Sequence, residues 1–162
     1  MKIFIILGIS LSIFLLPILS YADSLILSPV DFLPALSGTE YEAGNSSLVV
    51  KPASPFTGFW APVHLPDGAK ITSVVVFYRD SSAVGNMLVS LFKCNIYTES
   101  QDIMASWISS SDSLAYQNHK ISPITGNNSV NNNGYCYMVL CSFTDASVGN
   151  QVKLHKVKIL YQ

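Results

Sequence analysis

The three histidines, His64, His119 and His155, are the first residues to consider for catalysis or metal binding. They lie in distant segments, without the close spacing of a zinc site such as two histidines four residues apart beside a glutamate. His64 stands three residues before Asp67, and this pair with a serine would supply the parts of a hydrolytic triad. The sequence contains no nucleophile-elbow pattern that would expose such a serine. We therefore expect no enzyme activity, no metal and no cofactor, and a secreted hydrolase using His64 and Asp67 is the less favoured hypothesis.

Asp80 is a candidate ligand-binding carboxylate, because it ends an apolar strand and precedes Ser81 and Ser82. It could bind calcium together with loop carbonyls and Asp145. In the alternative interpretation the Asp80 carboxylate accepts backbone N–H groups of the next loop in an Asx-turn. The sequence lacks the D-x-D-x-D-G pattern of a calcium loop, which favours the turn.

Trp60 and Trp107 are candidates for binding sugar rings, together with Tyr41, Tyr78 and Tyr116. A flat platform of such rings is a common carbohydrate site on β-sandwich folds, and that argument rests on fold analogy alone. The alternative interpretation places both tryptophans in the core, because they bury a large area.

The three cysteines are Cys94, Cys136 and Cys141. Cys136 and Cys141 are five residues apart in one predicted strand, and an odd spacing points them to opposite faces. In an oxidising compartment we expect one disulfide, between Cys94 and either Cys136 or Cys141. Three unpaired buried cysteines are the alternative.

The elements that position these residues are predominantly β-strands. Apolar and β-branched runs separated by turn signals predict about eight or nine strands and no helix. The segment 99–113 also fits helical spacing, but its neighbours favour a strand. The fold expected is all-β, an antiparallel β-sandwich that is jelly-roll-like rather than immunoglobulin-like. The predicted strands are residues 24–28, 47–51, 56–63, 71–79, 87–97, 99–113, 114–121, 135–143 and 151–161.

The segments between these strands carry further predictions. Residues 31–45 are expected to cross the surface irregularly, because prolines and glycines interrupt them. Residues 65–68 form a Leu-Pro-Asp-Gly turn in which Gly68 takes a positive φ. Strand 71–79, apolar on both faces, is expected to be central, covered on both sides and paired as a hairpin with the strand from Met87. The asparagine-rich residues 124–134 are expected to form a flexible loop.

Residues 1–22 have the features of a signal peptide. Lys2 precedes an almost wholly apolar run over residues 3–19, and Ser-Tyr-Ala then places small residues before a cleavage site after Ala22. An uncleaved membrane anchor is the alternative, since the run approaches spanning length. Residues 23–162 then form a single β-sandwich domain of ordinary size.

Low charge sets limits on the partners. Charged residues make up 12% of the chain and the net charge is −1, so no nucleic-acid partner is expected. Lys153, Lys156 and Lys158 form the one basic cluster, which is typical of a solvated strand face. Sparse charge leaves more neutral surface for contacts with other molecules.

Five segments carry a recognisable pattern in this order: PVDFLPALSG, FWAPVHLPDGAKITSVVVFYRDSS, VSLFK, GYCYMVL and VKILYQ. Together they resemble an uncharacterised group of small secreted bacterial proteins and appended surface domains. That group is marked by an APV-x-LP-x-GA-x-I turn and strand, a following aspartate and a closing aromatic strand. The resemblance implies a secreted β-sandwich and carries over no activity or catalytic residue, and the three cysteines of this chain depart from it.

The sequence thus favours a secreted, periplasmic or cell-surface module without catalytic function, which binds a partner or assembles with itself. If the two-sided apolar strands 71–79 and 135–143 exceed what one core can bury, the excess would form an interface. A carbohydrate-binding module using Trp60 and Trp107 is the alternative, with a surface glycan as partner. No stable membrane insertion is expected after signal cleavage.

Overall fold

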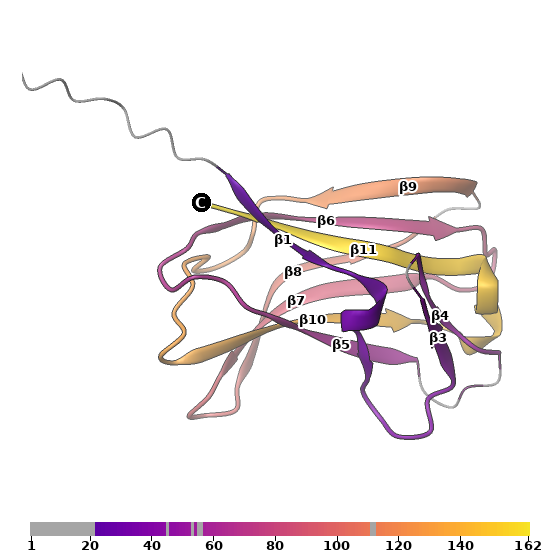
Figure 1. Ribbon diagram of the computed structural model, residues 1–162, viewed down its shortest axis with the longest axis horizontal. Helices are drawn as coiled ribbons and strands as arrows, with labels where there is room; N and C mark the ends of the chain where they lie inside the picture. The colour runs from indigo at the N-terminus through magenta and orange to yellow at the C-terminus, as the bar shows by residue number, and fades with distance from the viewer. Residues whose placement is uncertain (1–21, 45, 53, 55–56, 111–112) are drawn as a thin grey trace, which may run out of the picture.

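The computed structural model describes residues 22–44, 46–52, 54, 57–110 and 113–162. The expected signal peptide lies outside the described residues, apart from Ala22. The described chain folds into two antiparallel sheets packed face to face, a jelly-roll-like β-sandwich (Figure 1). No helix within these ranges is long and apolar enough to cross a membrane.

Eleven strands and two short 3-10 helices make up the described fold. Sheet A has the order β3-β4-β11-β6-β9, with β1 also beside β11, and sheet B has the order β2-β5-β10-β7-β8. The strands of sheet A are β1 (Asp23–Leu27), β3 (Tyr41–Ala43), β4 (Leu48–Val50), β6 (Ile71–Asp80), β9 (Ser113–Ile121) and β11 (Val152–Tyr161). The strands of sheet B are β2 (Leu33–Pro34), β5 (Gly58–Val63), β7 (Met87–Asn95), β8 (Gln101–Ile108) and β10 (Tyr135–Phe143). The helices are η1 (Pro29–Asp31) and η2 (Ala146–Gln151).

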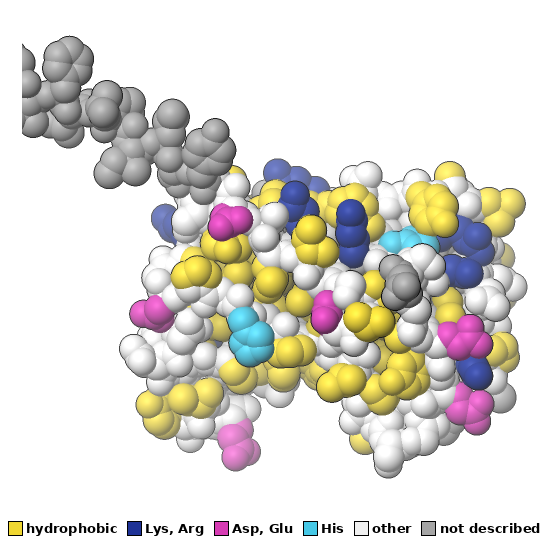
Figure 2. All heavy atoms as spheres, viewed as in Figure 1, with side chains coloured by type: hydrophobic (Ala, Val, Ile, Leu, Met, Phe, Trp, Pro, Cys, Tyr) yellow, Lys and Arg dark blue, Asp and Glu magenta, His cyan; other side chains and the backbone are white. Residues whose placement is uncertain are grey.

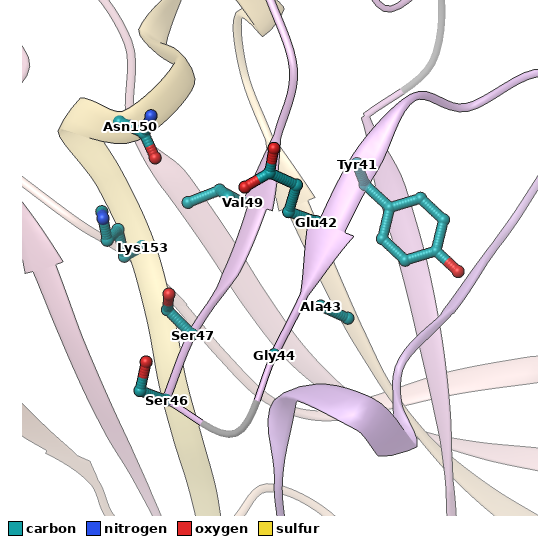
Figure 3. Close-up of a pocket in the computed structure, with 9 residues that line it drawn as sticks. All are labelled: Tyr41, Glu42, Ala43, Gly44, Ser46, Ser47, Val49, Asn150 and Lys153. Carbon is teal, nitrogen blue, oxygen red and sulfur yellow. The ribbon is translucent and has the colours of Figure 1, made fainter.

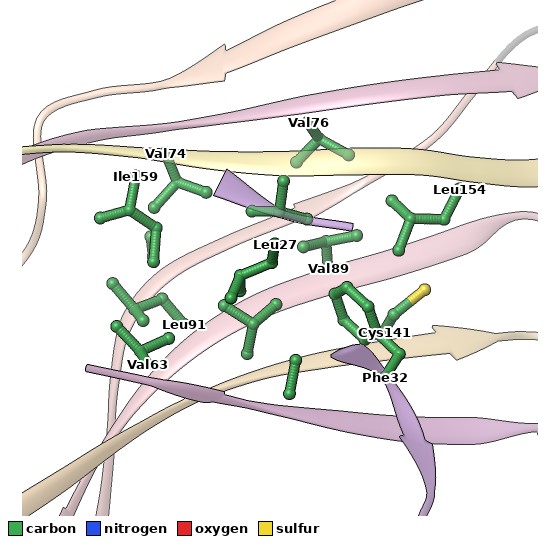
Figure 4. Close-up of a cluster of buried hydrophobic side chains, with 14 of the residues drawn as sticks. Leu27, Phe32, Val63, Val74, Val76, Val89, Leu91, Cys141, Leu154 and Ile159 are labelled. Atoms are coloured by element: carbon green, nitrogen blue, oxygen red, sulfur yellow. The ribbon is translucent and has the colours of Figure 1, made fainter. Parts of the chain in front are cut away.

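The core is formed by the inward-facing rows of both sheets (Figure 4). Successive side chains of a strand point to opposite faces, so every second residue enters the core. Each fully buried valine or leucine contributes about 1.5–3 kcal/mol relative to an exposed one. The central members, all at most 1% exposed, are Val74, Val76, Val157 and Ile159 from sheet A, and Val89, Leu91, Val139 and Cys141 from sheet B.

All nine predicted strands are present, including the ambiguous segment, which forms β8. The expectation of an irregular segment over residues 31–45 was wrong in part, because β2 and β3 lie within it. These strands are only two and three residues long, so neither carries a readable alternation of apolar and polar residues.

The expected hairpin between strand 71–79 and the strand from Met87 was also wrong. β6 belongs to sheet A and β7 to sheet B, so residues 81–86 cross between the layers. The turn at Leu65–Gly68 likewise carries the chain from sheet B to sheet A, with Gly68 at φ +79° as expected. A strand buries its apolar residues equally well whether the next strand pairs with it as a hairpin or lies in the opposite sheet. The sequence pattern therefore could not distinguish these two arrangements.

β6 is central in its sheet, as predicted, but it is not covered on both sides. Its outward residues Val75 and Phe77 are half-buried on the molecular surface. The ammonium of Lys156 lies 4.4 Å from the centre of the Phe77 ring. Long lysine stems therefore shield this face where a second protein layer was expected.

The asparagine-rich loop is fastened to the turn that precedes β6, in contrast to the flexible loop that was expected. Gly68 N donates to Val130 O at 2.9 Å, and Val130 N donates to Ala69 O at 2.7 Å. The Asn132 side chain donates to Leu65 O at 2.9 Å. With Val130 only 3% exposed, the loop closes one end of the core.

Asp80 is a buried structural carboxylate at the end of β6. It is 0% exposed, and its Oδ1 accepts a hydrogen bond of 3.1 Å from Ser82 N, as in the predicted Asx-turn. Its Oδ2 accepts from the Ser109 hydroxyl, whose oxygen accepts in turn from Met87 N at 2.8 Å. One carboxylate therefore joins the ends of β6, β7 and β8.

Replacing Asp80 with alanine should lower the free energy of unfolding by about 2–4 kcal/mol, because buried donors at Ser82 and Ser109 lose their acceptor. Urea denaturation followed by tryptophan fluorescence measures this loss. The control Asp102→Ala removes an exposed carboxylate on β8 and should change stability by less than about 0.5 kcal/mol. Equal urea midpoints for the two variants would contradict the structural role of Asp80.

Candidate functional site

The outer face of sheet B is apolar and is the strongest candidate for a binding surface. Strand register places its outward side chains in rows that run across the sheet. We call this surface the apolar face. It comprises Leu33, Trp60, Leu140, Ser90 and Ser106 in one row, Pro62, Met138, Phe92 and Ile103 in a second, and Ser142, Leu88 and Ile108 in a third.

No residue of the apolar face carries a charge. Leu33, at one margin of the sheet, is 62% exposed, and Ile103 and Ile108, at the other margin, are 55% and 48% exposed. The residues on the strands between them are mostly half-buried. Soluble proteins seldom present so continuous an apolar surface unless it meets another molecule.

Trp60 and Phe92 form the aromatic centre of the apolar face. Their ring centroids are 5.4 Å apart with an interplanar angle of 62°, an edge-to-face contact that stabilises both rings. Trp60 lies directly between Leu33 and Leu140 in the register of the sheet. The Trp60 ring is half-buried, so part of it is available to a ligand.

This face has few polar atoms, and some of them are already hydrogen-bonded to each other. The hydroxyl oxygens of Ser90 and Ser106 are 2.8 Å apart and hydrogen-bonded to each other. Ser142 and Gln101 add polar atoms near the margins of the same sheet. A ligand would therefore meet C–H groups and aromatic carbon in the centre and find hydrogen-bonding groups at the margin.

Trp107 lies away from Trp60, so the two tryptophans do not form one platform. Its side chain points inward from β8, with its ring centroid 4.7 Å from Tyr78 and 4.8 Å from His119. The His119 ring is stacked on it at 12°. Trp107 thus closes the open edge of the sandwich between β8 and β9, a packing role.

Asp80 is similarly separated from the apolar face, because its carboxylate is buried in the hydrogen bonds described above. Asp145, the residue considered with it for calcium, accepts a hydrogen bond of 2.8 Å from Ser147 N. That hydrogen bond lowers the pKa of the exposed Asp145 carboxyl. The described residues contain no group of three or more histidine, cysteine or acidic side chains able to hold a metal ion.

His64 and Asp67 do not form a catalytic pair. His64 is exposed, next to Pro62, while Asp67 Oδ1 accepts a hydrogen bond of 2.8 Å from Asn132 N. Among the hydrogen bonds of the described chain, none joins His64 to Asp67. The Asp67 carboxylate instead helps to fasten the asparagine-rich loop.

A polar groove lies beside the β3–β4 hairpin, with a volume of about 720 Å³. Figure 3 shows Glu42 and Lys153 on the groove side and the Tyr41 ring pointing away from them. Tyr41 packs on Phe59 of the core with ring centroids 5.2 Å apart. The groove therefore offers polar atoms without a ring on which a sugar could stack.

The outer face of sheet A is basic. Register places Arg79 beside Lys153, and Lys120 in one row with Lys158. The sequence cluster contains only the three lysines of β11, because Arg79 and Lys120 join it through long-range strand pairing. Figure 2 shows blue side chains gathered along the upper margin, where β9, β6 and β11 lie in Figure 1.

His155 stands among these bases on β11. Burial is the main cause that lowers its pKa, and the nearby charges of Lys153 and Arg79 add to this effect, while a hydrogen bond to Ser46 O opposes it. The Tyr116 ring is tilted against it, with centroids 4.6 Å apart.

The three cysteines are free thiols, so the expected disulfide is not formed in this structure. Cys136 is exposed and pairs directly with Cys94 across β10 and β7, whereas Cys141 pairs with Val89 in the core. The prediction that Cys136 and Cys141 face opposite sides is confirmed. Burial raises the pKa of both the Cys94 and the Cys141 thiols, and the neighbouring Cys136 adds to the shift at Cys94. Of the two pairings considered, the register permits Cys94–Cys136 and opposes Cys94–Cys141.

No protein-family model matches the sequence, and no curated protein matches it. Among solved structures, the chain is similar to a low-affinity xylan-binding module, CBM86, from the gut symbiont Roseburia intestinalis, with 12% identity, a TM-score of 0.45 and coverage of 86% of this chain and 96% of that one. It is also similar to the CBM22-1–GH10 modules of endo-1,4-beta-D-xylanase 10B from Clostridium thermocellum, complexed with xylohexaose. There the identity is 14%, the TM-score 0.43 and the coverage 86% of this chain and 26% of that one. At these values the likeness does not indicate a ligand for this chain.

Thiol labelling should separate the three cysteines. Iodoacetamide should modify Cys136 first and leave Cys141 unmodified in the native protein, because burial opposes formation of its thiolate. In urea all three should react. Peptide mass spectrometry after a time course measures the order, and native labelling of Cys141 as fast as Cys136 would contradict the assigned faces.

Proposed function

We propose that the protein is a secreted, non-catalytic module that binds a neutral polysaccharide through the apolar face. The observation that carries this proposal is a charge-free sheet surface with the Trp60–Phe92 pair at its centre. Trp60 was a predicted ligand-binding residue, while Trp107 and Asp80 are outside the proposed site because they serve packing and loop structure.

The chemistry of the apolar face suits sugar rings. A pyranose ring has apolar C–H faces and hydroxyl groups around its rim, so it packs flat against an aromatic ring while its hydroxyls remain near water. Trp60 and Phe92 supply the rings, and the flanking aliphatic side chains extend the contact.

The dimensions suit a chain of several sugar units. Strands lie about 4.8 Å apart, so the four spacings between the five strands of sheet B span about 19 Å. An uncharged polymer is favoured, because a carboxylate or phosphate pressed onto this face would lose hydration without meeting an opposite charge. The small number of polar groups predicts modest affinity.

Self-association through the same face is the second candidate, favoured by its high aliphatic content. The twelve positions of the apolar face, each about 4.8 by 6.8 Å, cover about 390 Å² per copy. Two copies would then bury about 780 Å², below the roughly 1,000 Å² of a specific interface, so such a dimer would be weak. Light scattering of residues 23–162 at tens of micromolar separates the candidates, since a dimer would hide the surface that the polysaccharide needs.

Trp60→Ala should weaken binding to the polysaccharide that retards the wild-type protein by about tenfold or more, because the contact loses its central aromatic ring. Affinity electrophoresis in xylan, cellulose derivatives, soluble chitin and starch measures the change. The matched control is Tyr97→Ala, which removes a 78% exposed ring from the turn after β7, outside the apolar face, and should retain wild-type affinity.

Leu33→Glu provides a second test that does not depend on core packing, because Leu33 is 62% exposed. A charge placed beside Trp60 should weaken binding to a similar degree while the protein stays folded by circular dichroism. Unchanged retention of both Trp60→Ala and Leu33→Glu, or no retention of the wild type by any polymer, would contradict the proposal.

Secretion is part of the same proposal. Expression of the full chain in a bacterial host should release a protein whose first residue is Asp23, since small residues precede that bond. Mass spectrometry of the exported protein measures the cleavage site. A chain that stays membrane-bound with Met1 present would support the uncleaved anchor instead.

A further inference from the structure

The outer face of sheet A carries five bases in an ordered array. Strand register gives one row with Lys158, Val75 and Lys120, a second with Lys156, Phe77 and Asn118, and a third with Lys153 and Arg79. Residues two apart on one face of a strand are about 6.8 Å apart, as Lys156 and Lys158 are, while a register shift at His155 separates them from Lys153. We call this surface the basic face, and define it by Arg79, Lys120, Lys153, Lys156 and Lys158.

No acid neutralises this array from within. Of the described residues of β6, β9 and β11, only Asp80 is acidic, and its carboxylate is 0% exposed on the inner side. Glu42, at the margin near Lys153, forms an ion pair of 3.8 Å with Lys51. The whole chain has a net charge of −1, so the residues outside this face carry a net negative charge.

Aromatic rings are interleaved with the bases. The Lys156 ammonium lies 4.4 Å from the Phe77 ring centre, and Tyr116, 77% exposed, lies against His155. The face therefore offers one exposed ring, Tyr116, together with several positive charges.

We propose that the basic face binds an anionic polysaccharide that carries carboxylates, such as a polyuronate. Its sugar rings would pack on Tyr116, and its carboxylates would pair with the lysines and Arg79. This site is separate from the apolar face, which lies on the outer side of the other sheet.

A carboxylated glycan fits better than the other anionic polymers. A nucleic acid would meet a chain of net negative charge and a face with a single arginine. Proteins that bind nucleic-acid phosphates rely on arginine and carry a high net positive charge. An anionic membrane would gain little from this face, because Phe77 is half-buried beneath Lys156 and not free to insert.

The test is affinity electrophoresis of residues 23–162 in gels that contain sodium polygalacturonate at low ionic strength. The double variant Lys156→Ser, Lys158→Ser should weaken binding by about tenfold or more, because two charge pairs are lost. The control Lys51→Ser, Lys70→Ser removes the same charge elsewhere and should change binding by less than about twofold. Added salt should weaken wild-type binding through screening.

Three results would overturn the proposal: no retention in polygalacturonate, equal losses in the two double variants, or tighter binding to single-stranded DNA or phosphatidylglycerol vesicles than to polygalacturonate. Leu33→Glu is expected to keep its polygalacturonate binding, since Leu33 belongs to the apolar face. Failure here leaves the neutral-polysaccharide proposal intact, because that proposal is read out with Trp60→Ala in uncharged gels.

Discussion

The alternation of side chains along each strand is the constraint on which the rest of this structure depends. One row of β6 and β11 must pack against one row of β7 and β10, and valines, isoleucine and leucine fill both rows at almost zero exposure (Figure 4). The other row of each strand is then forced onto an outer surface. The character of the two outer faces therefore follows from residues that the core does not use.

The two outer faces have opposite characters because their strands carry different second rows. On β10 the second row holds Met138 and Leu140, so sheet B is apolar outside as well as inside. On β11 it holds Lys156 and Lys158, and the register shift between Leu154 and Lys156 brings Lys153 onto the same side, so sheet A is basic outside. The sandwich therefore presents an apolar and a basic surface on opposite sides.

The sequence predicted the fold class and nine of the eleven strands, because apolar runs bounded by turn residues mark them. It could not predict which sheet receives each strand, since β6 and β7 alternate in the same way whether they pair or cross between layers. The site was predicted only in part. Trp60 points outward and Trp107 points inward. Which side of the sheet each ring takes depends on the strand register, which the sequence does not reveal. The apolar strand 135–143 did indicate surplus hydrophobic surface, and its outward row now contributes to the apolar face.

Nuclear magnetic resonance titration of isotope-labelled residues 23–162 with xylohexaose, cellohexaose and chitohexaose would show whether the apolar face binds a neutral polysaccharide. We expect at least one of these oligosaccharides to shift the Trp60 indole signal and amides of β5, β7 and β10, while amides of β9 and β11 stay unchanged. Shifts confined to sheet A, or no shifts with any of the three at millimolar concentration, would contradict this expectation.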